Sequence, residues 1–196
     1  MVKFDDGCND FYRYRAYFLA AAGIVEFKDC SLADEIVSQI IKWGFAYFNE
    51  EKQKGRTFLE PIAEGSREIL KETDRERAIS TLVELINTSQ NGYTWWHAAK
   101  SLGIIGQNNP FAIEALVEFI GTCQNELIRR QAAKSLGIIS PNNTVAIECI
   151  ANSGDVITAE ILENIDKKNR VSLAILFDLM GTFQDELRFF LTYYAK

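Results

Sequence analysis

The chain has 196 residues, of which 47% are hydrophobic, enough for one folded domain or one segment of a repeat array with a sizeable apolar core. Its formal net charge of -6 at pH 7 provides no basic field to hold a phosphate backbone, which excludes nucleic acid as an expected partner. No stretch approaches the run of about 18 apolar residues that a membrane-spanning helix needs. A membrane is therefore not an expected partner either.

The start of the chain and its cysteines bear on where the protein works. The first ten residues carry three aspartates and no apolar run, unlike a secretory signal. The four cysteines, Cys8, Cys30, Cys123 and Cys149, are far apart in the sequence, and His97 is the only histidine. We therefore expect no metal and no cofactor, and reduced cysteines in a cytoplasmic protein.

The N-terminal part, residues 1–75, is expected to form irregular helical hairpins. Apolar spacing predicts helices over about 12–25, 32–48 and 61–72. The polar segment 49–55 between the last two is expected to be a loop. No segment of the chain carries a convincing strand signal.

Internal repeats predict the architecture of the rest. The string AAKSLGII occurs at 98–105 and again at 132–139, a spacing of 34 residues. A third copy follows at an offset of 60, where GTFQDEL at 181–187 matches GTCQNEL at 121–127. These spacings predict repeat units at about 76–106 and 107–140, a shortened unit at 141–166 and a terminal unit at 167–196.

Each unit is expected to be a helical hairpin that buries one face of each helix. In the second AAKSLGII helix the predicted buried stripe is Ile128, Ala132, Ala133, Leu136 and Ile139. Its partner helix is expected at about 111–120, after Pro110, with these residues inward: Ile113, Leu116, Val117 and Ile120. Hairpins with apolar flanks need neighbours to stack on, so the predicted fold is all-α, an α-α superhelix of stacked hairpins in one continuous solenoid.

The motif AAKSLGII, preceded by LVELI, resembles HEAT repeats of the short, phycobilisome-lyase-like class. The N-terminal part, from FLAAAGIVEFKDC onward, is similar to the region that leads into such repeats in cyanobacterial NACHT-type signalling ATPases. The resemblance implies a right-handed superhelix in which one helix of each hairpin lines a concave binding face. The chain departs from that family in lacking a GxxxxGK[ST] phosphate loop, so no nucleotide chemistry is implied.

Two tryptophans stand out as candidate partner-binding residues. Trp95 and Trp96 occupy the positions that Arg129 and Arg130 hold in the next repeat. At 100° per residue the second of the pair should point outward and the first sideways. Exposed aromatic residues of this kind anchor protein interfaces. The alternative is that the N-terminal helices or the loop near residues 47–58 cover both side chains.

Charged residues recur at matching positions of the repeats. Glu84, Glu114, Glu118 and Glu148 fall on the helix that the resemblance places on the concave side, where they would form an acidic stripe for a basic partner. An ordinary solvated face is the alternative. Two lysines, Lys100 and Lys134, occupy matching positions of the other helices and are interpreted as solubilising charges.

The chain ends in an apolar helical run formed by Leu187, Phe190, Leu191 and Tyr194. This helix either packs inward as the cap of the array or mediates self-association. We therefore expect a monomer, or a weak homo-oligomer through the C-terminal helix.

The predicted function is a non-catalytic protein–protein interaction scaffold that binds another protein and resembles the sensor or regulatory arm of a NACHT-type signalling protein. His97 has no serine or cysteine at a recognisable spacing, so no catalytic residue is expected. The resemblance leaves open a phycobilin lyase subunit or a lyase-like chaperone of biliproteins. A repair glycosylase built on HEAT-like repeats is a third reading, which the net negative charge disfavours.

Overall fold

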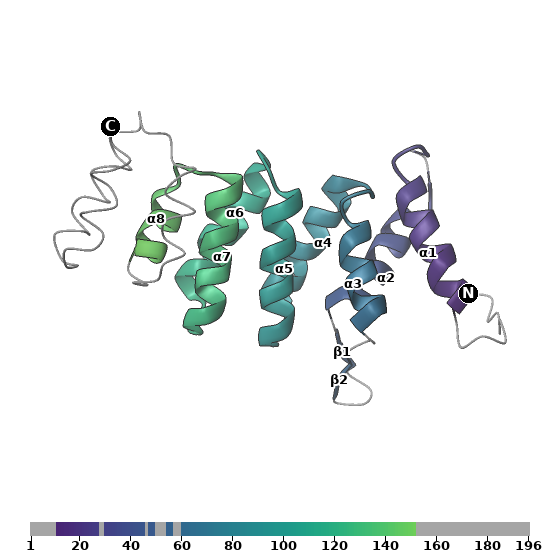
Figure 1. Cartoon of the computed structure of the whole chain (residues 1–196), viewed down its shortest axis with the longest axis horizontal. Coiled ribbons are helices and arrows are strands. Elements are labelled where there is room, and N and C mark those ends of the chain that lie inside the picture. Colours follow the sequence, from purple (N-terminus) through teal and green to yellow (C-terminus); the bar gives the residue numbers. More distant parts are fainter. Residues whose placement is uncertain (1–10, 28–29, 46, 50–53, 57–59, 152–196) are drawn as a thin grey trace. The chain divides into compact units, whose positions relative to one another are not determined.

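The computed structural model describes residues 11–27, 30–45, 47–49, 54–56 and 60–151. Most of these residues form helices (Figure 1). The helices are α1 (Phe11–Gly23), α2 (Ala33–Phe45), α3 (Glu60–Ile69), α4 (Arg75–Thr88), α5 (Gly92–Ile105), α6 (Pro110–Thr122), α7 (Glu126–Ile139) and α8 (Thr144–Ala151). The fold is all-α and built from successive helical hairpins, which confirms the predicted class.

The chain divides into two compact units, an N-terminal unit of residues Met1–Ile105 and a C-terminal unit of residues Gly106–Lys196. In the N-terminal unit α2 packs on α3 and α4, and α4 packs on α5. In the C-terminal unit α7 packs between α6 and α8. The predicted unit boundaries remain a prediction, and the expected terminal unit at 167–196, with its apolar helix, lies outside the described residues.

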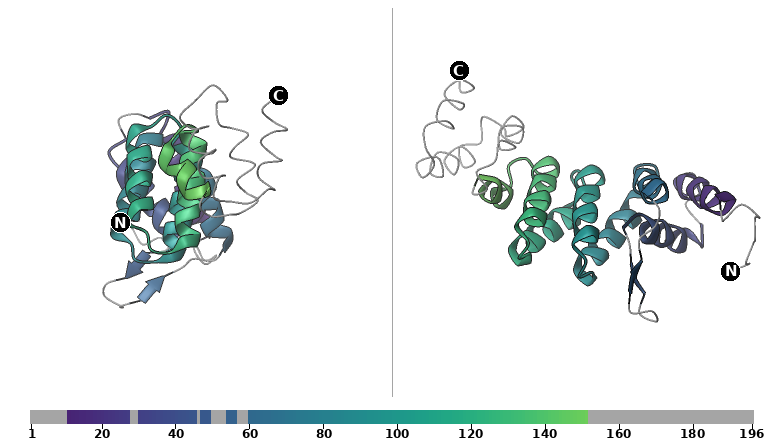
Figure 2. Two further views of the ribbon diagram at one scale, coloured as in Figure 1. Left: turned by 90° about the vertical axis from the view of Figure 1, so that its left-hand side faces the viewer. Right: turned by 60° about the horizontal axis from the view of Figure 1, so that its bottom comes forward.

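A short β-hairpin corrects the prediction for the segment after α2. Tyr47–Asn49 (β1) pairs in antiparallel register with Lys54–Arg56 (β2), where a helix end and a loop were expected. Figure 2 shows the hairpin projecting from the helices of its unit. The first strand carries two aromatic residues of high strand propensity, but the second, Lys-Gly-Arg, has none. The second strand therefore forms because it pairs with the first, and such pairing cannot be recognised from the residues of the second strand alone.

Aspartate and asparagine side chains begin the helices of both units. Each accepts a hydrogen bond at 2.9 to 3.2 Å from a backbone N–H two or three residues further on, at the helix start where no carbonyl is available. These residues are Asp74, Asn91, Asn109, Asn125 and Asn143. Two pairs of them are 34 residues apart, 91 with 125 and 109 with 143, so the caps follow the repeat.

The C-terminal end of α2 is closed by side chains of other helices. The guanidinium of Arg67, on α3, donates to the Gly44 carbonyl at 2.7 Å. The buried hydroxyl of Thr94, on α5, donates to the Phe45 carbonyl at 2.7 Å. Both carbonyls belong to the last turn of the helix, where the helix provides no backbone N–H four residues later to donate to them. These bonds connect three helices of the N-terminal unit.

The core follows the predicted stripe on α7 and departs from it on α6. All five predicted residues of α7 are buried, as are the matching alanines and leucine of α5. On α6, Leu116 and Ile120 are buried, but Ile113 and Val117 are only half-buried. The buried face is completed instead by Ala112, Ala115 and Phe119. Because α6 packs against α8 as well as α7, its buried face is turned from the one that a single partner helix would require.

Candidate protein-binding surfaces

Trp95 is held against the neighbouring helix. Its indole N–H donates to the Ile86 carbonyl at 3.1 Å. That carbonyl is one of the last four of α4, which have no partner within the helix. The side chain is half-buried. Packing within the N-terminal unit therefore accounts for this tryptophan, which was a candidate binding residue.

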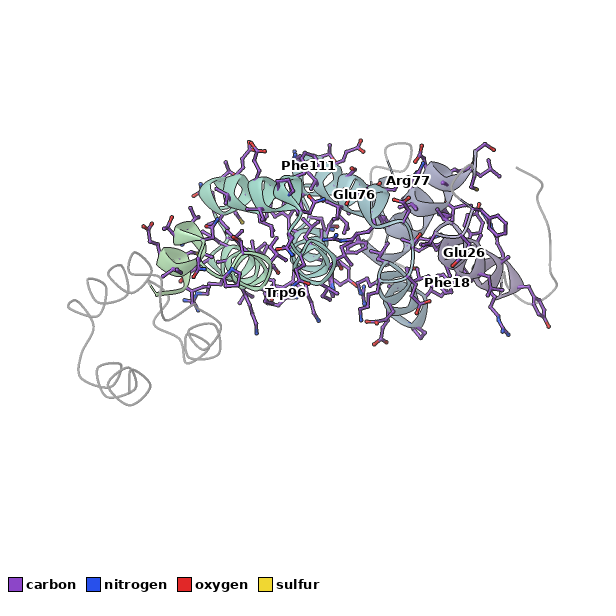
Figure 3. All side chains as sticks on the ribbon, turned by 90° about the horizontal axis from the view of Figure 1, so that it is seen from above. Phe18, Glu26, Glu76, Arg77, Trp96 and Phe111 are labelled. Atoms are coloured by element: carbon purple, nitrogen blue, oxygen red, sulfur yellow. The ribbon has the colours of Figure 1, made fainter. Side chains whose placement is uncertain are left out.

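Trp96 is also half-buried, where the sequence predicted an outward side chain. Figure 3 shows it on the side of the N-terminal unit opposite to Glu76 and Arg77 of α4. One turn before it lies Tyr93, whose ring contacts that of His97 with the centroids 4.4 Å apart. The Tyr93 hydroxyl accepts a hydrogen bond from Arg67 at 3.1 Å. Trp96 thus adjoins a partly exposed aromatic and cationic surface, and its role in binding remains a prediction.

The four candidate glutamates are all exposed. Glu84 lies on α4 of the N-terminal unit, Glu114 and Glu118 lie one turn apart on α6, and Glu148 lies on α8. In the C-terminal unit α6 and α8 thus each present acidic side chains to solvent. Phe111, one turn before Glu114, is 49% exposed and adds an apolar group to this helix.

The sequence prediction missed a row of outward side chains on α5. Tyr93, His97, Lys100 and Ile104 follow the spacing i, i+4, i+7, i+11 and therefore share one face of the helix. Tyr93 and Ile104, at the two ends, are 37% and 50% exposed. Lys100, between them, is exposed. We name these four residues the α5 row.

The same arrangement recurs on α7. Leu127, Gln131, Lys134 and Ile138 lie 34 residues after their counterparts, and we name them the α7 row. Its apolar ends are 63% and 52% exposed. The adjacent Arg130 is paired with Glu126 at 2.5 Å. Both rows therefore present apolar ends and a lysine between them. The matched lysines were visible in the sequence, but exposed apolar residues beside them were not.

An open groove of about 460 Å³ lies at the start of α4, lined by Ile24, Val25 and residues 73–77. The two arginines and Asp74 in its lining form hydrogen bonds. Arg77 donates to the carboxylates of Asp74 and Asp34 at 2.7 Å, and the hydrogen bond to Asp34 is the main reason that the pKa of Arg77 is raised. Arg75 donates to the Ile105 carbonyl at 2.6 Å. These hydrogen bonds connect the start of α4 with α2 and with the end of α5.

In the part of the chain that the structure describes, no three His, Cys, Asp or Glu side chains gather as they would around a metal ion. Among the described helices, none has the length and apolar character of a transmembrane segment.

Comparison with known families agrees with this architecture. Residues 66–137 match the family of HEAT repeats. The match spans α4, α5, α6 and most of α7, and it includes the α5 row and the α7 row as far as Lys134. No curated protein and no solved structure matches the chain.

Proposed function

We propose, from the HEAT repeats of residues 66–137, that this chain is a non-catalytic scaffold that binds another protein. Stacked helical repeats present extended surfaces that commonly mediate protein–protein interaction. The observation that carries the proposal is the large apolar side chains left exposed on the repeat helices, 49% to 63% for Ile104, Phe111, Leu127 and Ile138. Apolar side chains rimmed by charged ones are typical of surfaces that a partner covers.

The finer proposal is a sensor or regulatory arm like that of cyanobacterial NACHT-type signalling proteins. It is supported by the sequence similarity of the N-terminal part and by the missing phosphate loop, which leaves a binding role without nucleotide chemistry. A phycobilin lyase subunit or lyase-like chaperone is the alternative, supported by the repeat class that the motif AAKSLGII resembles.

Photo-crosslinking in cells tests the scaffold proposal. A photoreactive phenylalanine analogue replaces Phe111 or Ile104, which lie on different helices and are about half exposed, 49% and 50%. We expect light-dependent adducts of discrete mass at one of these positions at least, and excess wild-type chain should suppress them. If no position on either helix yields an adduct, the scaffold proposal fails.

The identity of the adduct separates the finer alternatives. A signalling ATPase or its effector supports the regulatory arm, and a biliprotein subunit supports the lyase reading. Co-expression of the chain with that subunit and a bilin then gives a second readout. A coloured, covalently modified subunit contradicts the non-catalytic assignment.

A further inference from the structure

Two repeat helices of this acidic protein, α5 and α7, carry a net positive charge. α5 carries Lys100 and no acidic residue, and α7 carries three basic residues against Glu126 alone. In contrast, α6 and α8 carry only acidic ionisable side chains, apart from the thiol of Cys149. The described helices of the C-terminal unit therefore include a basic helix and two acidic ones, in a chain whose net charge is -6.

The basic helices also expose apolar groups in a fixed geometry. In each row the two apolar ends are 11 residues apart, which corresponds to about 16 Å along a helix at about 1.5 Å per residue. Lys100 and Lys134 lie seven residues after the first apolar end, in the same register. Two apolar anchors with a cation between them suit a helical segment of about three turns that has apolar ends and carboxylates between them.

We infer that each of the two rows, taken by itself, binds an acidic amphipathic helix of a partner protein. This inference rests on the proposed scaffold function and adds the chemistry of the partner. A nucleic acid would match the lysines but not the exposed Ile104, Leu127 and Ile138. A basic partner, as the candidate glutamates would require, finds no carboxylate in either row.

Peptide binding to the full chain tests this inference. The probe is a fluorescein-labelled helical peptide of about 16 residues, with leucines at the spacing of the rows and glutamates at the flanking positions. Its counterpart has lysine in place of every glutamate. By fluorescence anisotropy, we expect the acidic peptide to bind and its Kd to rise with salt between about 50 and 300 mM, because exposed charges are screened. The basic peptide should bind at least about 5-fold more weakly.

Charge reversal locates the binding surface. The double variant Lys100→Glu with Lys134→Glu should weaken binding of the acidic peptide by roughly 5-fold or more, since it replaces attraction by repulsion. The matched control carries Lys42→Glu, an exposed lysine near the end of α2, and should change the Kd by less than about 2-fold. Unchanged circular dichroism establishes that both variants remain folded.

Several results overturn the inference. Equal or tighter binding of the basic peptide contradicts it, as does an unchanged Kd for the double variant. Dimerisation seen by sedimentation and abolished by the same variant identifies a second copy of this chain as the occupant. Retention of single-stranded DNA that the double variant abolishes identifies a nucleic acid instead.

Crosslinking separates failure of this inference from failure of the scaffold function. If adducts form from position 111 on α6 but not from positions 104 or 138, the scaffold function is supported and binding through the rows is contradicted. Adducts from none of the three reject both.

Discussion

Replacing Thr94 by valine tests how the helices of the N-terminal unit are joined. Thr94 is 2% exposed, and its hydroxyl donates to the Phe45 carbonyl at 2.7 Å. Valine keeps the branched shape of the side chain but removes the donor, so the carbonyl at the end of α2 faces a methyl group. Leaving one buried polar group unsatisfied costs about 1–3 kcal/mol. At a urea m-value of about 2 kcal/mol/M, that loss lowers the unfolding midpoint by about 0.5–1.5 M.

Intrinsic tryptophan fluorescence during urea unfolding measures this loss selectively. All three tryptophans of the chain, Trp43, Trp95 and Trp96, belong to the N-terminal unit, so the signal reports that unit. The control is Thr88→Val, because the exposed Thr88 hydroxyl bonds only within α4, to the Glu84 carbonyl. We expect the control to change stability by less than about 0.5 kcal/mol. If Thr94→Val falls within the same limit, the bond to α2 does not stabilise the unit as reasoned.

Three further predictions concern other parts of the structure. Trp95→Phe removes the donor to the Ile86 carbonyl and should cost about 0.5–1.5 kcal/mol in urea unfolding, whereas an equal cost for Trp96→Phe would contradict the assignment of the two indoles. Asn125→Ala removes the N-cap of α7 and should cost about 1 kcal/mol, measured by circular dichroism at 222 nm; an unchanged midpoint would show that the cap is dispensable. Burial raises the pKa of the Cys149 thiol, which lowers its thiolate fraction. Its alkylation, followed by peptide mass spectrometry, should therefore reach half its maximal rate at a higher pH in the folded chain than in urea, and coincident profiles would contradict this.

Much of the repeat fold could be predicted because it repeats in the sequence. The two copies of AAKSLGII predicted two helices with the same buried stripe, and α5 and α7 have it. The asparagines at 91 and 125 matched in the sequence as well, and each caps a helix in the structure. In these helices local pattern and tertiary packing agree, so the pattern alone was sufficient.

The remaining parts depend on neighbours that a local pattern does not reveal. The strand at 54–56 forms only by pairing with 47–49, and the buried face of α6 is turned because two helices pack on it. A rule of 100° per residue places a side chain on a helix but does not place the neighbouring helices.

The candidate binding residues show the same limit. Trp95 and Trp96 attracted attention as an aromatic pair, yet both are half-buried and Trp95 bonds to α4. Lys100 and Lys134 were interpreted as solubilising charges at matching positions of the repeats, whereas in the structure Ile104 and Ile138, one turn further on, are 50% and 52% exposed. Each copy of AAKSLGII ends in two isoleucines. The first of each pair, Ile104 or Ile138, is exposed, and the second, Ile105 or Ile139, is buried. Composition could therefore not distinguish the exposed isoleucines from the buried ones.

In-cell photo-crosslinking from position 104 is the most direct measurement of whether this chain binds a partner through its repeats. Ile104 is 50% exposed on α5, within the residues that match HEAT repeats. We predict one or a few adducts of defined mass that form only under light and disappear when wild-type chain competes. A uniform absence of adducts from this position, and from 111 and 138, would contradict a protein-binding scaffold.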